Sequence, residues 1–555
     1  MRERNGLNTQ QASPQKNAGA GRLFVLIYCV ALAMAVLASA AYAWEETSRE
    51  HEFAQASDQF GYLEMAQDVR RGSAPHGLPK YTVDSEHVRL TIDFLKARGV
   101  EVSNNGTMGP NGYHYFAGSD KVICQYPPGA GFLLSLFPEG HALFAWEVVT
   151  IALLCAGAAW GIWRAMALQT AAAAFSAGMA CLAVQGGLLI LGLAVSYSVD
   201  LLCVPMLLAL LAVFIAREGE NWKWIVGRAL VCGAAVGFAT LVRLAAVFFL
   251  PGFLMLLLGV PGRKKSLPIA AFLLGFLLAG VVPLMVHQHG LTGSFFSPTY
   301  TPADASPPSF ASIKTNLYYY FLGDGKNMAL WLAVGAIGFV LWAVGQRRGG
   351  DDAAASDRRE RWYAAAAVTF WLVPTVYFLT HTIVTPYYQL PTIFVCLAAM
   401  ALAVMRGRPM RHAWLAAFGA AVTGGFLLFV AAYLPPLVDE SQYLVDTALP
   451  VGMDDPHAWI VGDRLLGTLW YYHGIAGQQI DGMDPATRNA FVEFIQERHE
   501  PLFVMADNPA MENVVRELQG NGVALRDAGT FAASKMRREK RSENVTVYRV
   551  EWPAR

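Results

Sequence analysis

The chain has 555 residues, of which 55% are hydrophobic and only 15% are charged. Soluble domains carry roughly 25% charged residues, so this composition excludes an ordinary soluble protein. The 42 basic residues balance the 42 acidic residues, and the chain therefore has no net charge to attract nucleic acid. Several uncharged runs reach the roughly 20 residues that cross a bilayer. The composition predicts a polytopic α-helical membrane protein.

The N-terminal residues 1–21 are polar and basic, which predicts a disordered tail on the cytoplasmic side. An apolar run follows from Leu23 to Trp44 and ends in small residues that resemble a signal-peptidase site. The run is long for a signal peptide, so we expect a retained first helix. Residues 45–140 are hydrophilic and form a predicted large outer loop.

Asp58 lies at the start of this loop, before an amphipathic pattern that ends at Gly72. The pattern predicts a short helix. Asp58 is then either a functional carboxylate held at the membrane surface or simply the N-cap of that helix. Glu64 is expected on a solvated face of the same helix. Further on, Pro127-Pro128-Gly129 breaks the chain before a short interfacial helix.

Charged and polar residues divide the remaining apolar sequence into predicted spans. These are approximately residues 142–163, 168–194, 201–216, 229–260, 268–286, 328–344, 362–379, 390–405 and 413–434. With the first helix and a break inside 229–260, they give about eleven crossings. Basic residues mark the links on one side, which predicts a cytoplasmic N-terminus and an outer C-terminus.

The break inside 229–260 is predicted from Arg243 and Pro251-Gly252. A straight helix would hold the guanidinium deep in lipid, at a cost of about 3 kcal/mol or more. We therefore expect two short segments that meet at Arg243 near the outer surface. There Arg243 either binds a phosphate or extends toward the lipid headgroups. Asp200, in a short outer link, either orients a substrate or cation or caps the next helix.

Histidines and tyrosines mark other outer ends of the predicted spans. His287 and His289 form a His-x-His pair, which is either a metal site or a pair of interfacial side chains. Tyr387 and Tyr388 fit an aromatic interface belt, with stacking on a substrate as the alternative. Six of the seven cysteines lie in apolar runs and are expected to be small core residues.

Residues 435–555 return to a soluble composition. Apolar runs at 458–462 and 502–506 predict buried parallel strands, each followed by a helical pattern, and 545–550 predicts a closing strand. These elements indicate an extracytoplasmic C-terminal α/β domain. No glycine-rich phosphate loop follows either of the first two strands in the sequence, so nucleotide binding is not indicated.

Four segments carry a resemblance to a known superfamily. They are the segment from Asp58 to Ala66, Tyr126-Pro127-Pro128-Gly129, the segment from Gly237 to Arg243, and the segment from His289 to Ser294. Their order and predicted topology resemble the C-type (GT-C) membrane glycosyltransferases, which include protein O-mannosyltransferases and lipid A aminoarabinose transferases. The resemblance covers about residues 20–435 and implies a GT-C-like transmembrane domain over residues 22–434.

The resemblance implies an activity and a set of site residues. A hexose or pentose would pass, with inversion, from a polyprenyl-phosphate donor to a hydroxyl of a glycan, lipid or protein acceptor at the outer face of a bacterial inner or plasma membrane. Asp58 would be the general base. The implied substrate-binding residues are Arg243, which would hold the phosphate, together with Asp200, Tyr62, Tyr126, His289 and Tyr388.

Two features depart from the superfamily pattern. Gln59 follows Asp58 where many members carry a second acid. The pair of adjacent carboxylates that could share a metal ion is therefore missing. A divalent cation is a candidate cofactor, but the sequence assigns no ligands to it. The outer loop also carries a long insert over residues 73–121, which is a candidate for shaping the acceptor site.

Two other classes of function remain open from the sequence. One is a transporter or flippase of a lipid-linked sugar, which would be expected to carry paired polar residues at mid-membrane depth. The other is a catalytically silent member of the fold that acts as an assembly partner. Substitution of Asp58 separates the enzyme from the silent protein, because only the enzyme needs this carboxylate.

Overall fold

The structure is a computed structural model of the whole chain. It describes residues 16–47, 56–72, 81–169, 171–193, 197–214, 221–260, 265–300, 308–321, 353–399, 449–532 and 544–552, with short gaps inside 81–169, 353–399 and 449–532. The predicted spans at 328–344 and 413–434 lie outside the described residues.

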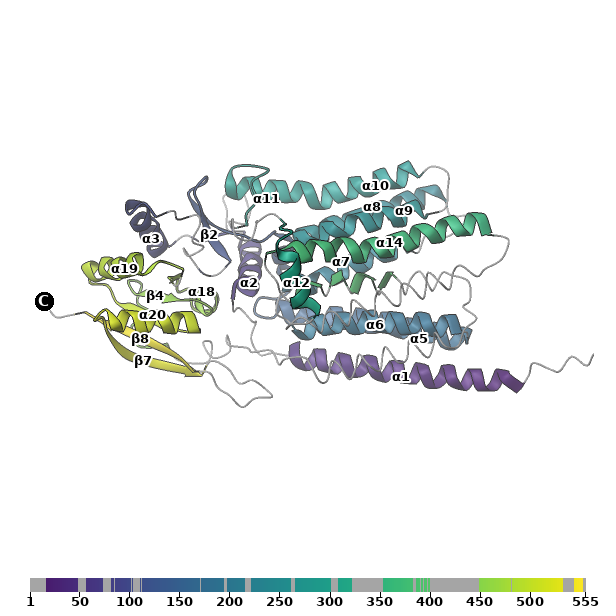
Figure 1. Ribbon diagram of the computed structural model, residues 1–555, viewed down its shortest axis with the longest axis horizontal. Coiled ribbons are helices and arrows are strands. Elements are labelled where there is room, and N and C mark those ends of the chain that lie inside the picture. Colours follow the sequence, from purple (N-terminus) through teal and green to yellow (C-terminus); the bar gives the residue numbers. More distant parts are fainter. Residues whose placement is uncertain are drawn as a thin grey trace, which may run out of the picture.

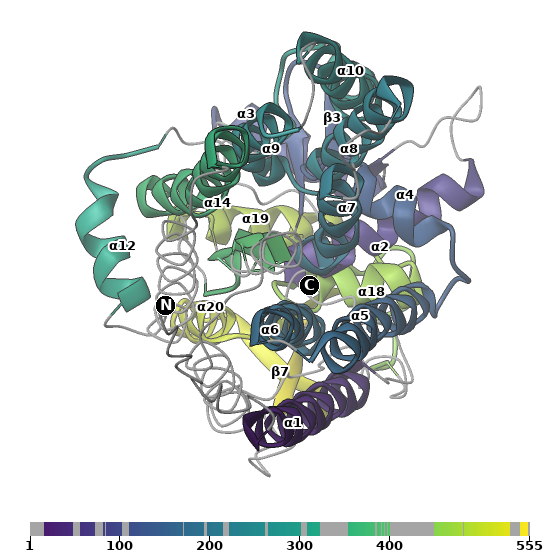
Figure 2. The same cartoon turned by 90° about the vertical axis from the view of Figure 1, so that its right-hand side faces the viewer.

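Long apolar helices run side by side along the molecule and form a bundle (Figure 1). They are α1 (Lys16–Thr47), α5 (Ala142–Leu168), α6 (Ala171–Leu193), α7 (Tyr197–Phe214), α8 (Trp222–Val242), α9 (Leu250–Leu258), α10 (Ser266–Phe276), α11 (Val282–Thr292) and α14 (Ala353–Thr380). Seen from its end, the bundle groups α1 with α5 and α6, α8 with α10, and α9 with α14 (Figure 2). The predicted first helix is present as α1. It begins at Lys16, so residues 16–21, which were predicted to belong to a disordered tail, are helical.

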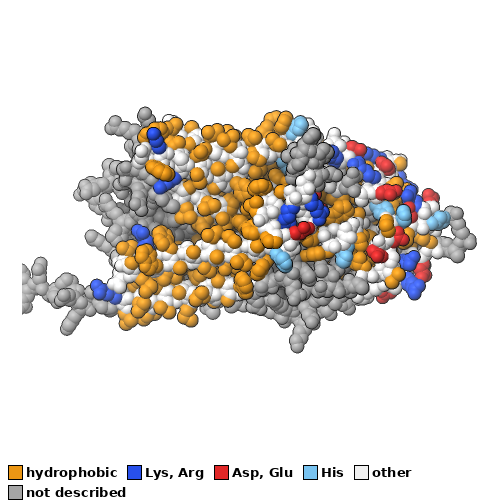
Figure 3. Space-filling model, turned by 180° about the vertical axis from the view of Figure 1, so that it is seen from behind, with side chains coloured by type: hydrophobic (Ala, Val, Ile, Leu, Met, Phe, Trp, Pro, Cys, Tyr) orange, Lys and Arg blue, Asp and Glu red, His pale blue; other side chains and the backbone are white. Residues whose placement is uncertain are grey.

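Four helices in the described part are long and apolar enough to cross a membrane. They are Val25–Trp44, Ala142–Leu168, Trp222–Val242 and Ser266–Thr292. Their outward sides carry exposed leucine, valine and tryptophan side chains, and the surface of the bundle is accordingly apolar (Figure 3). Because water would not cover such a surface favourably, the bundle is that of an integral membrane protein. The predicted count of about eleven crossings is not confirmed by these residues.

Glycines bring the helices of the bundle into close contact. A Cβ atom at Gly233 of α8 would lie 1.9 Å from the carbonyl oxygen of Phe272 in α10. A Cβ atom at Gly275 of α10 would lie 2.3 Å from the carbonyl oxygen of Leu230. Helices packed in lipid commonly approach through such small residues, because no water is released to drive their association.

The predicted break at Arg243 is confirmed. Helix α8 ends at Val242, and Arg243 has an extended backbone with φ −151° and ψ 122°. A 3-10 segment, η2 (Leu244–Phe249), follows and leads into α9.

A smaller layer covers one end of the bundle. It begins with α2 (Ala56–Arg71), which corresponds to the predicted helix after Asp58, and with α4 (Gly129–Ser135). The residues between them form α3 (Glu86–Ala97) and an antiparallel sheet of β1 (Thr82–Val83), β3 (Lys121–Cys124) and β2 (Tyr113–Phe116). The insert expected at 73–121 is therefore folded in its described parts.

The C-terminal residues form a five-stranded sheet in the order β5-β4-β6-β8-β7. The strands are β4 (Trp459–Gly462), β5 (Gly477–Gln479), β6 (Leu502–Ala506), β7 (Ala524–Ala532) and β8 (Asn544–Glu551). Strand β4 pairs in parallel with β5 and β6, whereas β8 is antiparallel to β6 and β7. Helices α18 (Leu466–His473), α19 (Pro485–Arg498) and α20 (Pro509–Gly520) accompany this sheet.

The insert packs against the C-terminal sheet. His87 of α3 contacts the ring of Trp459 at a centroid distance of 4.4 Å, and Phe94 contacts Phe491 and Phe494 at 5.5 and 5.1 Å. One hydrophobic cluster runs from Phe60 of α2 through these aromatic side chains. Since aromatic pairs add about 1 kcal/mol each beyond their buried area, the insert stabilises the position of the sheet.

Candidate functional site

Asp58 lies in the first turn of α2 and is half-buried. The described helix begins at Ala56, so Asp58 is inside the helix and is not its N-cap. The N-terminal end of a helix favours a negative side chain by about 0.3–1 kcal/mol. Most other side chains of α2 are buried, which fixes the helix and therefore the position of Asp58.

Tyr62, which lies on α2 with Asp58, forms an aromatic pair with Tyr126, and their ring centroids are 4.8 Å apart. Gly61 makes this contact possible, because a Cβ atom there would lie 2.7 Å from the Tyr126 ring. The Gln125 side-chain amide donates a hydrogen bond to the Tyr126 hydroxyl at 3.1 Å. The hydroxyl of Thr299 donates a hydrogen bond to the backbone carbonyl of Gln125 at 2.9 Å.

Helix α4 connects α2 to the end of α8. A Cβ atom at Gly131 would lie 2.5 Å from the Cβ of Met65 in α2, and one at Gly129 would lie 2.5 Å from the carbonyl carbon of Leu241. Arg70 of α2 also donates to the carbonyls of Leu134 and Phe137 at the C-terminal end of α4, at 2.9 and 2.8 Å. Two of the segments that carried the resemblance, around Asp58 and around Pro127-Pro128-Gly129, are thus in direct contact.

Arg243 follows directly on the end of α8 that α4 contacts. Its guanidinium lies over the ring of Tyr388, 4.7 Å from the centroid. Tyr388 belongs to the 3-10 turn η4 (Pro386–Gln389), and its ring contacts Phe378 and His381 at 5.4 and 6.0 Å. The aromatic ring holds the guanidinium in place, and arginine is a residue type well suited to phosphate recognition.

We call the junction layer α2, α4, the Gln125–Tyr126 segment and the ends of α7, α8 and α11 that meet them. Leu201, Val242 and Leu291 all belong to the hydrophobic cluster that contains Phe60 and Tyr62. These three residues are sequence neighbours of Asp200, Arg243 and the histidines of α11. The junction layer therefore contains Asp58, Tyr62 and Tyr126, and it adjoins the helix ends that carry Asp200, Arg243 and the histidines of α11. Asp200 itself lies in the first turn of α7, but its side chain is outside the described part.

The two histidines of α11 occupy different surroundings. His287 is buried, contacts Tyr81 edge-on at 5.0 Å and hydrogen-bonds to the backbone of Tyr126. His289 is exposed and stacks on Phe295 at 4.2 Å. Residues two apart on a helix point to different sides, so this pair does not form a common metal site. The predicted substrate residue His289 lies apart from Tyr126, and His287 is the histidine that contacts it.

Glu64 differs from its expected position on a solvated face. Its side chain is buried between α2 and α18 and accepts a hydrogen bond from Trp470. Burial raises the pKa of Glu64 to about 7, although the Trp470 hydrogen bond opposes that rise. The prediction was wrong because helical periodicity does not show that the C-terminal helix α18 covers this side of α2.

The comparisons with known proteins address the fold. No protein-family model matches the chain, and no curated protein matches it in sequence. The chain resembles the crystal structure of ArnT from Cupriavidus metallidurans bound to undecaprenyl phosphate, with a TM-score of 0.50 and 14% identity. This match covers 93% of this chain and 97% of the ArnT chain. The chain shares the fold of ArnT. The apo ArnT structure from the same organism gives a TM-score of 0.47 and 13% identity over 93% of this chain and 97% of that chain.

The fold that the chain shares with ArnT is the fold that the resemblance in the sequence predicted. At 14% identity the comparison transfers no residue role. The roles in the junction layer depend on its own geometry.

Proposed function

We propose that this protein is an inverting glycosyltransferase that moves a hexose or pentose from a polyprenyl-phosphate donor to an acceptor hydroxyl. The observation that carries the proposal is the junction layer, which joins the helix of Asp58 to the helix end at Arg243 through α4. This layer lies at the end of an apolar bundle, where a lipid-linked phosphate would meet a water-soluble acceptor. The ArnT structure with the same fold is bound to undecaprenyl phosphate, which supports a polyprenyl phosphate as the lipid partner.

Asp58 acts as the general base in the proposed reaction. Its carboxylate takes the proton of the acceptor hydroxyl while the hydroxyl oxygen forms a bond to the anomeric carbon of the donor sugar. The bond between that carbon and the phosphate oxygen breaks, and polyprenyl phosphate leaves with the electron pair. A single displacement inverts the anomeric centre. A positioned base contributes about 10²–10⁴-fold to such a rate.

Arg243 stabilises the departing phosphate. A guanidinium can donate two parallel hydrogen bonds to phosphate oxygens, and the Tyr388 ring holds it in place. Negative charge grows on the leaving group as its bond breaks, so a fixed cation favours the transition state over the ground state. Tyr62, Tyr126 and Asp200 are proposed to line the substrate site of the same layer. His289 is retained only as a peripheral contact, because it lies on an exposed side of α11.

The divalent cation stays a prediction from the resemblance. Among the described residues, no group of three or more histidine, cysteine, aspartate or glutamate side chains is arranged to hold a metal ion. The Asp200 side chain lies outside that part of the structure. The roles proposed for Asp58 and Arg243 apply with or without a bound cation.

The proposed topology places residues 1–21 in the cytoplasm, residues 22–434 in the membrane with about eleven crossings and the outer loop at 45–140, and residues 435–555 outside as an α/β domain. The membrane is proposed to be a bacterial inner or plasma membrane. Figure 3 supports this orientation, since Lys and Arg side chains lie at the end of the apolar bundle opposite the charged C-terminal region.

The experiment compares the wild type with Asp58→Asn in a strain that lacks the gene. Cell-surface glycans, glycolipids and glycoproteins are analysed by mass spectrometry at matched membrane levels of the two proteins. We expect the wild type to restore a missing sugar and Asp58→Asn to restore at most about 1% of it, because the base is lost.

Asp93→Asn is the matched control, since Asp93 is an exposed carboxylate on α3 outside the junction layer. It should behave as the wild type. Equal restoration by Asp58→Asn and the wild type would contradict the general-base role. A transporter or an assembly partner would then be the better account.

A further inference from the structure

We propose that the C-terminal region carries a binding site for neutral carbohydrate, in a pocket at its end far from the bundle. The pocket has a volume of about 430 Å³, within the range of about 300–1,000 Å³ that is usual for ligand sites. It lies between α19, the turn that joins α20 to β7, and the last residues of β8. Figure 1 shows that the chain ends on this side of the sheet, opposite the bundle.

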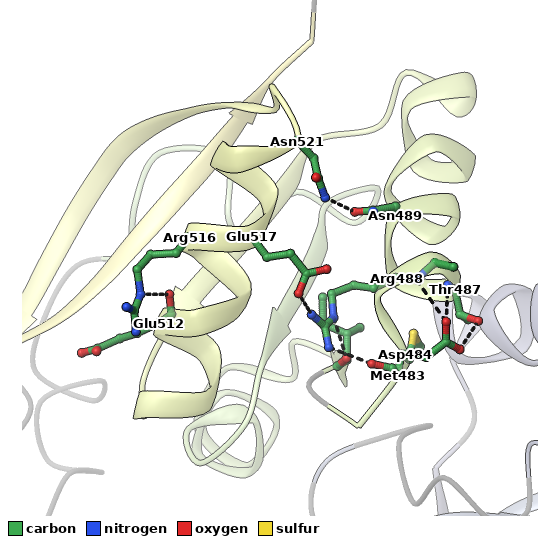
Figure 4. A network of polar contacts seen from close by, with 11 residues as sticks. Met483, Asp484, Thr487, Arg488, Asn489, Glu512, Arg516, Glu517 and Asn521 are labelled. Atoms are coloured by element: carbon green, nitrogen blue, oxygen red, sulfur yellow. Dashed lines mark hydrogen bonds and ion pairs between the residues drawn. The ribbon is translucent and has the colours of Figure 1, made fainter.

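The walls of the pocket are held in place by polar contacts between α19 and α20. Arg488 of α19 is buried and forms an ion pair with Glu517 of α20. Its guanidinium also donates to the carbonyls of Ile480 and Met483, at 3.2 and 2.7 Å. Figure 4 shows Arg488 and Glu517 pointing toward one another from the two helices. Because Arg488 is buried and makes further hydrogen bonds, its ion pair with the half-buried Glu517 fixes the spacing of the helices.

The lining combines hydrogen-bonding side chains of two kinds. Asn489, Gln496 and Asn521 carry amides that both donate and accept, and Glu493 carries a carboxylate that accepts. Asn521 donates to Asn489 at 3.0 Å on the rim, which orients both amides (Figure 4). Sugar hydroxyl groups also both donate and accept, so such a lining satisfies neighbouring hydroxyls of a sugar ring.

Trp552 adds an apolar surface to this polar pocket. Its indole N–H donates to the carbonyl of Glu500 at 2.9 Å, and the ring is half-buried. The ring is thus fixed while part of it borders the pocket. The C–H face of a sugar ring can pack on such an indole while its hydroxyls bond to the amides.

The charges of the lining disfavour other ligands. Two carboxylates, Glu493 and Glu551, border the pocket, and no lysine or arginine is among its lining residues, all of which the structure describes. A phosphate, nucleotide or acidic sugar would meet these carboxylates, and the nearby Arg526 guanidinium is already paired with Glu551 at 4.0 Å. A neutral saccharide is compatible with the whole set.

This inference does not depend on the glycosyltransferase proposal, because the pocket shares no residue with the junction layer. The test uses saturation-transfer NMR on the full chain in lipid nanodiscs. The neutral probes are maltose, cellobiose, lactose and N,N′-diacetylchitobiose. Glucosamine is the cationic probe and glucose 6-phosphate the anionic probe.

We expect saturation transfer to at least one neutral disaccharide. Gln496→Ala should weaken its binding by about fivefold to tenfold, since hydrogen bonds to the sugar are lost. Gln496 is half-buried on the surface of α19, so the variant should fold. Trp552→Leu should weaken binding at least as strongly. Glu497→Ala is the matched control, because Glu497 is exposed on the same helix outside the pocket, and it should bind as the wild type does.

Three results would overturn the proposal. The first is that no neutral disaccharide receives saturation. The second is that Gln496→Ala and Trp552→Leu bind a neutral probe as well as Glu497→Ala does. The third is that only glucosamine binds and that salt abolishes its binding, which would show a cation-attracting surface in place of a carbohydrate site.

Discussion

The bundle and the junction layer are both closely packed, but by different means. In the bundle, α8 and α10 meet through their backbones at Gly233 and Gly275. In the junction layer, buried aromatic rings such as Tyr62 lie beside buried polar groups such as Glu64 and Gln125. Because hydrocarbon cannot satisfy a polar group, charge in the bundle costs several kcal/mol. A layer at the membrane surface can hold the same groups at lower cost, so it is where catalytic groups can be placed.

Gly233→Ala should have the largest effect, since it tests the packing of the bundle. The added methyl would meet the Phe272 carbonyl oxygen at 1.9 Å and must force α8 and α10 apart. We expect a loss of about 3 kcal/mol or more, or no folded protein. The measurement is thermal unfolding of the purified protein in detergent.

Gly227→Ala is the control on the same helix, where a Cβ atom would have no neighbour within 4 Å. It should be neutral or stabilise by about 0.5–1 kcal/mol, because alanine favours a helix over glycine. If the two alanine variants unfolded at the same temperature, backbone contact would not be what packs α8 against α10.

Glu64→Gln tests the buried polar character of the junction layer. The folded pKa of Glu64 is raised from 4.5 to about 7, so the folded state binds this proton more tightly than the unfolded state does. The resulting stability is fully present below pH 4.5 and is lost as the pH rises to about 7. The difference is about 2–3 kcal/mol between these limits.

Glu64→Gln should remove this pH dependence and unfold at a higher temperature than the wild type at pH 8. Unfolding midpoints measured from pH 4.5 to pH 8 check it. Glu497→Gln is the control, because Glu497 is exposed on α19 and is not among the charges that act on Glu64, and it should keep the wild-type profile. A Glu64→Gln profile parallel to that of the wild type would show that Glu64 titrates equally in both states.

Asp120→Asn should have the smallest effect, because it changes a charge in water. The Asp120 carboxylate accepts from the Tyr115 hydroxyl at 2.6 Å and from Lys96 at 3.1 Å, which lowers its pKa. The site is exposed, so solvent and salt screen these contacts. At low salt we expect Asp120→Asn to unfold at a slightly lower temperature than the wild type. At about 1 M salt we expect the two proteins to unfold at the same temperature. A large loss that persists in salt would show that the contact is structurally important.

Much of the fold could be predicted because it follows from the free-energy cost of placing individual charged or apolar residues in lipid or in water. Arg243 interrupts an apolar run, so the break of the helix there follows from the energy of a buried charge. The apolar runs of β4 and β6 match their observed strands and parallel pairing. The pattern after Asp58 likewise matches α2.

Other elements could not be predicted from local pattern. Strand β7 is an edge strand with mostly half-buried or exposed residues and Gly529 within it, so it lacks an apolar run. Helix α19 was not expected, although Asp484 before Pro485 is an N-cap signal that the structure bears out. The burial of Glu64 depends on a contact with Trp470, about four hundred residues away in the sequence, which no local rule contains.

The central claim is that Arg243 binds the lipid phosphate while Asp58 takes the proton from the acceptor hydroxyl. It is tested most directly by native mass spectrometry of undecaprenyl phosphate binding to the purified wild type, Arg243→Ala and Asp58→Asn. Charged hydrogen bonds contribute about 1.5–3 kcal/mol, so Arg243→Ala should bind about tenfold to hundredfold more weakly, and Asp58→Asn should bind as the wild type does. Unchanged binding by Arg243→Ala, or a loss confined to Asp58→Asn, would contradict this division of roles.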